Sequence, residues 1–155
     1  MGSRPGRLVA FALLVAAVAS STASAAGVSV LFLGSGNRTD SNRTARTIDQ
    51  IVIHATEGSF VGSVRWLRNP HSRGSAHYVV SRRGQVVQLV STSDVAWHAG
   101  NWRVNAESVG IEHEGWTDDP AGFTQAQYRA SARLAAYPVL AHFHDRRVTL
   151  APVPV

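Results

Sequence analysis

The chain contains no cysteine and no lysine among its 155 residues. Without cysteine it can form neither a disulfide nor a thiolate nucleophile, and a metal site would have to use His, Asp or Glu. All fifteen basic residues are arginine, and with ten acidic residues they give a formal net charge of +5. This mild excess suits an anionic surface but is also common on ordinary solvated faces, and no basic run indicates nucleic-acid binding. The absence of an H-E-x-x-H motif disfavours a metalloprotease of that class.

The N-terminal residues have the pattern of a secretory signal peptide. Arg4 and Arg7 precede the run LVAFALLVAAVAS, which is too short and too rich in small residues for a comfortable membrane span. Ala23 and Ala25 then form the A-x-A arrangement that signal peptidase recognises. We therefore expect residues 1–25 to be a signal peptide, and the mature protein to be exported without a membrane attachment. An uncleaved N-terminal anchor is the alternative.

Residues 26–47 are predicted to be an exposed N-terminal arm. The segment holds a short apolar stretch, VSVLFLG, followed by SGNRTDSNRTART, which is polar and has no periodicity. We therefore place the folded domain at residues 48–155. A chain of this length has room for one domain with an adequate core.

Strand-like segments follow residue 47. IDQIVIHAT is a short apolar run rich in β-branched residues, which is typical of a buried strand. AHYVVS and QVVQLV are two further strand-like runs, and the RRG between them predicts a hairpin. SVGIEHEG, which begins at Ser108, alternates apolar and other side chains as a strand does.

Two helices are predicted from their capping residues. Ser59 can cap a helix that ends at Asn69, before a proline. Thr124 and Gln127 form a T-x-x-Q capping box that opens a second helix. Its predicted buried side comprises Tyr128, Ser131, Ala132, Ala135 and Ala136. Because strands and helices alternate, the predicted fold class is α/β, with a mixed central β-sheet flanked by helices.

Two residues in the predicted strands could carry chemistry. His54 ends a buried strand, where its ring could reach the rim of a cleft, although a satisfied core histidine is the alternative. Glu112 lies inside an apolar strand, and alternation places Val109, Ile111 and His113 on the opposite face. Burial raises the pKa of a carboxyl toward the range useful for general-base catalysis. The alternative is a glutamate on the solvated face of an edge strand.

Aromatic residues suggest a binding surface. AWHAGNW, residues 96–102, combines two tryptophans and a histidine with a flexible turn, which suits a platform for a sugar or peptide. The alternative is a loop that Trp97 and Trp102 anchor into the core. The hydroxyl of Tyr78 could donate to a developing oxyanion, or Tyr78 could be an ordinary half-buried strand aromatic.

Four of these segments resemble one known family when they are taken together. IVIHATEGS, SAHYVVSRRGQVVQLV, AWHAGNW and SVGIEHEG occur in the order, and at roughly the distances, seen in the zinc-dependent N-acetylmuramoyl-L-alanine amidases. This is the type 2 amidase family, to which animal peptidoglycan recognition proteins and phage lysozyme-amidases are related. The resemblance covers about residues 48–127.

The resemblance implies a role for each matched residue. His54 resembles the first zinc ligand, Glu112 the catalytic glutamate, and Tyr78 a tyrosine that many relatives keep beside the zinc. His98 resembles a cleft residue that contacts substrate, together with Trp97 and Asn101 in the same loop. His54, Tyr78 and Glu112 lie on predicted strands, and the other three residues lie on one loop.

The resemblance also implies a reaction. In the family, zinc is held by two histidines and an aspartate or cysteine, which leaves a position for water and substrate. Glu112 would take a proton from the water that attacks the amide between N-acetylmuramic acid and L-alanine, and would pass it to the departing nitrogen. The implied cofactor is zinc, the implied partner is peptidoglycan or a muropeptide, and the implied location is secreted or associated with the cell wall.

The C-terminus departs from the family pattern. Ala151 and Pro152 stand roughly where a Gly-His pair is expected, and no acidic residue follows Asp145. Of His142 and His144, at most one could face the first ligand from a helix, because their two-residue spacing separates them around its axis. We take His144 as the candidate and expect the amidase-like domain to be C-terminally incomplete. A catalytically silent peptidoglycan-binding homologue, or a truncated gene product, is the alternative.

Overall fold

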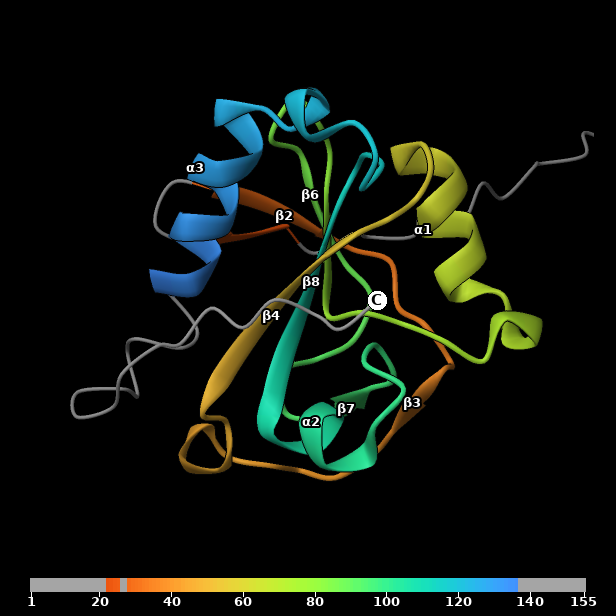
Figure 1. The fold of residues 1–155 in the computed structure, drawn as a ribbon. Coiled ribbons are helices and arrows are strands. Elements are labelled where there is room, and N and C mark those ends of the chain that lie inside the picture. The colour runs from red at the N-terminus through yellow and green to blue at the C-terminus, as the bar shows by residue number, and fades with distance from the viewer. Residues whose placement is uncertain (1–21, 26–27, 137–155) are drawn as a thin grey trace, which may run out of the picture.

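The computed structural model describes residues 22–25 and 28–136 of the chain. Six strands form a central sheet in the order β1-β2-β6-β5-β8-β4 (Figure 1). They are β1 (Thr22–Ala25), β2 (Val28–Phe32), β4 (Gln50–Ala55), β5 (Tyr78–Val80), β6 (Val86–Gln88) and β8 (Ser108–His113). The pairs β2/β6, β5/β8 and β8/β4 are parallel, whereas β1/β2 and β5/β6 are antiparallel. The predicted mixed sheet and the predicted hairpin are therefore confirmed.

Two helices cover opposite faces of this sheet (Figure 1). They are α1 (Phe60–Arg68) and α3 (Gln125–Leu134). The smaller elements are α2 (Trp102–Glu107), the antiparallel pair β3 (Arg38–Thr39) and β7 (Val95–Ala96), and the 3-10 turns η1 (Ala45–Thr47), η2 (Pro70–Ser72) and η3 (Pro120–Gly122). Within the part of the chain that the structure describes, no helix is both long and apolar enough to cross a membrane.

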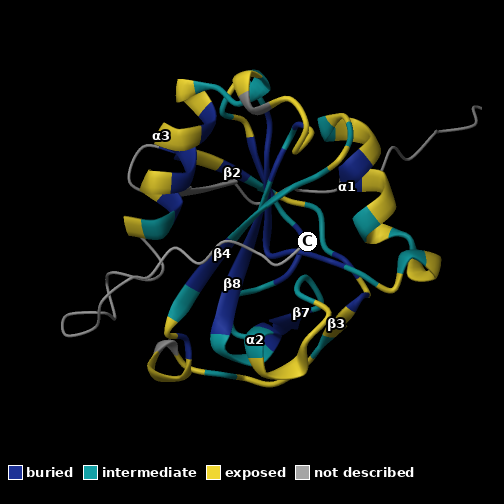
Figure 2. Ribbon diagram, in the orientation of Figure 1, coloured by how far each residue is buried: buried dark blue, intermediate teal, exposed yellow. Residues whose placement is uncertain are grey.

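Alternation along the strands divides the apolar core into two layers. On the α3 face, Val109 and Ile111 of β8 pack with Ala130 and Leu134. On the α1 face, Val64 belongs to a cluster with residues of the hairpin, of the segment after it and of β7, namely Val79, Val87, Leu89, Val90 and Ala96. Figure 2 shows the buried strands between helices whose outer surfaces are exposed. Burial of these apolar side chains fixes which face of each strand is left for other residues.

The predicted helix caps are confirmed. The Ser59 hydroxyl accepts a hydrogen bond from the backbone N–H of Gly62 at 3.3 Å, and α1 ends before Asn69. Thr124 and Gln127 form a complete capping box at the start of α3. These side chains satisfy backbone N–H groups that have no partner within the helix.

The side of α3 that packs on the sheet differs from the predicted one. The buried residues are Gln127, Ala130, Ser131 and Leu134. Tyr128, which was expected to be buried, is 48% exposed. Gln127 is buried because its amide donates a hydrogen bond to the carbonyl oxygen of Glu114 at 2.8 Å, in addition to capping the helix. An apolar pattern does not reveal a buried polar contact of this kind.

The prediction of an exposed arm over residues 26–47 is wrong for β2. This strand lies between β1 and β6 and pairs in parallel with β6. Val28 and Val30 are each only 6% exposed and belong to the core on the α3 face. Without β2, the backbone of β6 would form an open sheet edge, and the alternating side chains of VSVLF suit the half-buried position beside it.

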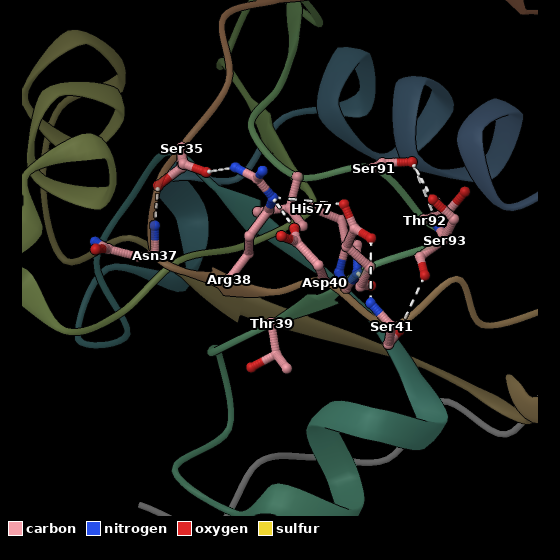
Figure 3. Close-up of polar contacts among 12 residues, drawn as sticks. Ser35, Asn37, Arg38, Thr39, Asp40, Ser41, His77, Ser91, Thr92 and Ser93 are labelled. Atoms are coloured by element: carbon pink, nitrogen blue, oxygen red, sulfur yellow. Dashed lines mark hydrogen bonds and ion pairs between the residues drawn. The ribbon is translucent and has the colours of Figure 1, made fainter.

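Hydrogen bonds attach the segment that follows β2 to other parts of the domain (Figure 3). Asn37 is buried, and its amide donates to the carbonyl oxygens of Asn69 at 2.9 Å and Gly74 at 3.0 Å. Ser41 reaches a backbone carbonyl of the loop before β7. Arg43 donates to the carbonyl oxygens of Thr92, Asn105 and Ala106. The sequence did not predict this because Ser, Asn and Arg are also the usual residues of an exposed linker.

Both ends of the chain leave earlier predictions open. Residues 1–21 lie outside the described residues, and so do residues 137–155, which include His142 and His144. β1 comprises the last four residues of the predicted signal peptide and pairs with β2. Cleavage after Ala25 would therefore detach this strand and leave β2 at the edge of the sheet.

Candidate active site

His54 and Glu112 lie side by side on adjacent strands. β4 and β8 are parallel, and their register pairs His54 with Glu112. Residues paired in this way point to the same face of a sheet. Ile53 and Ile111, one position earlier on each strand, pack in the core on the α3 face. His54 and Glu112 therefore point to the α1 face, as the alternation in the sequence predicted for Glu112.

The carboxyl group of Glu112 is buried and incompletely hydrogen-bonded. Its Oε2 atom has no hydrogen-bond partner among the residues that the structure describes. Burial, with a smaller contribution from the charge of Glu57, raises the pKa of Glu112 to about 8. Glu112 forms part of the lining of a cavity of about 420 Å³, which the turn after β4 and one side of α1 complete. A carboxyl group with a pKa near neutrality, facing a cavity, is suited to accept and return a proton.

His54 is linked to the loop between β7 and α2 through His98. The Nε2 atom of His54 lies 3.0 Å from Nδ1 of His98, and Nε2 of His98 lies 3.0 Å from the hydroxyl of Ser108. Burial lowers the pKa of His54, and burial together with the nearby charges of His54 and Arg43 lowers the pKa of His98 to about 3. Both rings are therefore neutral near pH 7.

The other two residues predicted to bind substrate from this loop also stabilise it. The indole N–H of Trp97 donates to the hydroxyl of Thr39 at 3.0 Å. The side-chain oxygen of Asn101 caps α2 by accepting from the N–H of Val104 at 3.1 Å. Trp102 is 60% exposed, so it does not anchor the loop. The loop thus brings His98 to His54, while a substrate contact by Trp97 or Asn101 stays a prediction.

Tyr78 lies on the wrong face of the sheet for the predicted role beside the metal. Its register partner on β8 is Ile111, and it packs in the same core layer, on the α3 face. It is 5% exposed, and burial raises its pKa to about 12. The sequence placed Tyr78 in the correct strand, but the side chain points away from Glu112, so we no longer assign it to the active site.

Sequence reasoning missed three residues around the site. Asn105 is buried, and its side-chain oxygen accepts from the backbone N–H groups of His98 and Ala99. Ser108 is fully buried beneath His98. Glu57 follows β4 at the edge where parallel strands end, which is a usual place for functional groups and could have been noted. Asn105 and Ser108 carry no such signal, because their partners lie on other segments.

The described residues offer one clear nitrogen ligand for a metal ion. His54 Nδ1 makes no hydrogen bond to any described residue, and an imidazole nitrogen is an ordinary zinc ligand. The orphaned oxygen of Glu112 lies on the neighbouring strand. Across residues 22–25 and 28–136, no group of three or more His, Asp or Glu side chains could hold a metal ion. Further ligands would have to come from elsewhere, and the candidate His144 lies outside the described residues.

Solved structures place the fold among those of peptidoglycan amidases and recognition proteins. The Drosophila peptidoglycan recognition protein SA superposes with a TM-score of 0.60 over 78% of this chain and 79% of its own, at 18% identity, which shows the fold alone. The Escherichia coli amidase AmiD, solved with anhydro-N-acetylmuramic acid-L-Ala-D-γ-Glu-L-Lys, superposes with a TM-score of 0.54 at 32% identity. That match covers 64% of this chain and 46% of AmiD.

Residues 44–150 match the Amidase_2 family of N-acetylmuramoyl-L-alanine amidases, and the chain belongs to this family. Among individual relatives, it is 40% identical over 97 residues to N-acetylmuramoyl-L-alanine amidase A of Achromobacter lyticus, which covers 62% of this chain and 51% of that protein. The chain spans about half the length of the curated relatives it matches. The resemblance found in the sequence is therefore confirmed at the level of the family.

Proposed function

We propose that the protein is a peptidoglycan hydrolase that cleaves the amide between N-acetylmuramic acid and L-alanine. The observation that carries the proposal is the buried, orphaned carboxyl oxygen of Glu112, which lies beside His54 and faces a cavity. Family membership supports the reaction, and the muramyl peptide bound to AmiD supports the substrate class. The N-terminal signal-peptide pattern supports export to the cell wall, where this substrate lies.

Glu112 would move one proton twice. As a carboxylate, it accepts a proton from the water that attacks the amide carbonyl carbon. As a carboxylic acid, it then donates that proton to the alanine nitrogen as the carbon–nitrogen bond breaks, which gives a free amine and a lactyl carboxylic acid that releases its remaining proton to solvent. Its raised pKa suits the second step, because the departing nitrogen must receive a proton in order to leave as a neutral amine. Zinc bound at His54 would supply a Lewis acid that polarises the carbonyl and acidifies the water.

The cavity beside Glu112 offers a surface for the muramyl group. Trp66 of α1 contributes to its lining and is 57% exposed. An exposed indole face can stack on a sugar ring. The substrate would then lie between α1 and the carboxyl ends of β4 and β8.

Hydrolysis of a defined substrate tests the proposal. We expect the zinc-supplemented protein to release the stem peptide from an N-acetylmuramoyl-L-Ala-D-isoglutamine substrate, with both products identified by mass spectrometry. A free stem peptide should stay intact, which serves as the matched control for general peptidase activity. If the folded protein sediments with insoluble peptidoglycan but leaves every muramyl amide intact, the enzyme proposal is wrong and the chain is a binding homologue.

A further inference from the structure

We propose that Ser108 and His98 are positioning residues that fix the tautomer of His54, with the proton on Nε2 and a free lone pair on Nδ1. The nitrogen left free is then the one that would bind a metal ion. Only this last step rests on the proposed function; the tautomer itself follows from contacts among buried groups. The three residues come from β4, the loop after β7 and the start of β8.

The direction of each hydrogen bond follows from a backbone carbonyl. The hydroxyl of Ser108 lies 2.5 Å from the carbonyl oxygen of Val104, and a carbonyl can only accept. The single hydroxyl hydrogen of Ser108 is therefore used there. The contact between Ser108 and Nε2 of His98 must then be donated by His98, which places the His98 proton on Nε2. Nδ1 of His98 is left as an acceptor.

The same logic continues to His54. Nδ1 of His98 lies 3.0 Å from Nε2 of His54 and has only a lone pair to offer, so His54 donates its Nε2 proton. A neutral imidazole carries one proton, and Nδ1 of His54 is then unprotonated. Histidines that bind metals usually donate their other N–H to a fixed partner, which sets the tautomer and orients the ring. Here the fixed partner is a second imidazole rather than a carboxylate.

Packing holds the His98 ring in the position that this relay requires. A Cβ atom at Gly110 would lie 2.4 Å from Cγ and 2.8 Å from Nδ1 of His98, so only glycine leaves room for the ring against β8. The backbone N–H of His98 donates to the side-chain oxygen of Asn105, and the ring centroid of His77 lies 5.9 Å from that of His98. His98 is therefore placed as part of the scaffold, which differs from the substrate contact that the sequence predicted.

Nitrogen-15 NMR of histidine-labelled, metal-free protein tests the tautomer directly. We expect the wild-type His54 signals to show a protonated Nε2 and an unprotonated Nδ1. Ser108→Ala should convert them to exchange-averaged values, whereas Ser108→Thr, which keeps the hydroxyl, should restore the wild-type pattern. Ser91→Ala, which removes a serine hydroxyl that bonds Ser93 instead, is the matched control and should change nothing. A proton found on Nδ1 of His54 in the wild type would overturn the inference.

Zinc titration provides the second readout. We expect Ser108→Ala to weaken zinc binding by roughly ten-fold to a hundred-fold, the range typical of lost outer partners, with Ser108→Thr close to wild type. An unchanged tautomer and unchanged zinc affinity in Ser108→Ala would refute the positioning role. If the tautomer behaves as expected but no muramyl amide is cleaved, the relay stands and the proposed function fails, so the two failures are distinguishable.

Discussion

Glu112 and Glu114 lie two residues apart at the end of β8, yet their surroundings are opposite. Both carboxylate oxygens of Glu114 accept backbone hydrogen bonds, from Phe60 at 3.0 Å and from Arg82 at 2.8 Å. Glu112 has a buried oxygen with no partner within residues 22–25 and 28–136, and its pKa is raised to about 8. The carboxylate of Glu114 therefore links the start of α1 to the hairpin. The oxygen of Glu112 is not occupied in this way, so it can take part in proton transfer.

The two faces of β8 differ in the same way. The side chains of Val109, Ile111 and His113 are buried beneath α3, and His113 Nε2 contacts the Ser131 hydroxyl at 2.5 Å. The opposite face carries Gly110 and Glu112, where an imidazole pair and a cavity replace apolar packing. One face of a single strand therefore stabilises the domain, while the other provides the site.

The largest expected effect comes from Glu112→Gln. The amide keeps the shape of the side chain but can neither accept nor return a proton, so turnover should fall by roughly a hundred-fold or more. The unfolding free energy should not fall, because a buried neutral group replaces one that is costly to ionise. Turnover of the muramyl amide and chemical denaturation measure the two quantities. A loss of turnover that merely follows a loss of folded protein would contradict the assignment.

Glu114→Gln should show the reverse pattern. An amide offers one acceptor oxygen in place of two charged ones, and its NH₂ group would face the N–H of Phe60 or Arg82. We expect the unfolding free energy to fall by about 2 kcal/mol, and turnover to fall far less than in Glu112→Gln. Glu107→Gln, at an exposed pair with Arg103, is the matched control and should change stability little. Equal losses of turnover from Glu112→Gln and Glu114→Gln would show that the two roles are not separated.

The pH dependence of stability tests whether the carboxyl group of Glu112 is buried without a partner. The pKa of Glu112 is raised in the folded protein, so the native state binds more protons than the unfolded state between the ordinary value near 4.5 and about 8. Its ionisation therefore destabilises the metal-free protein progressively as pH rises through this window. The stability of Glu112→Gln relative to the wild type should grow from pH 5 to pH 8. Denaturation curves that stay parallel across this range would argue against a buried, unpaired carboxyl.

The smallest effect is expected for Tyr78→Phe. The hydroxyl of Tyr78 lies on the α3 face, across the sheet from Glu112, so its removal should alter turnover by less than about two-fold. Steady-state kinetics of the variant measure this effect. A large loss of turnover with unchanged stability would show that Tyr78 does contribute to the reaction, although its side chain lies on the other face of the sheet.

The sequence predicted the local elements well, because their signals lie within a few residues. Ser59 and the pair Thr124–Gln127 cap the helices as expected, and the alternation of SVGIEHEG correctly separated Glu112 from His113. The fold class and the family also followed from four short segments in order. The prediction missed β2, because the short apolar run VSVLF is followed by a polar segment without periodicity, and so short a run does not by itself reveal which strand it pairs with.

Contacts between distant segments decided what the local pattern left open. Strand alternation is a local property of the chain, so it was enough to place a histidine and a glutamate on buried strands. The folded domain was needed to show that the two strands are neighbours in register, that Tyr78 faces the other layer, and that Ser108 lies beneath His98. These outcomes depend on which strands pair and which face each layer buries, and the free energy that settles both comes from packing the whole domain.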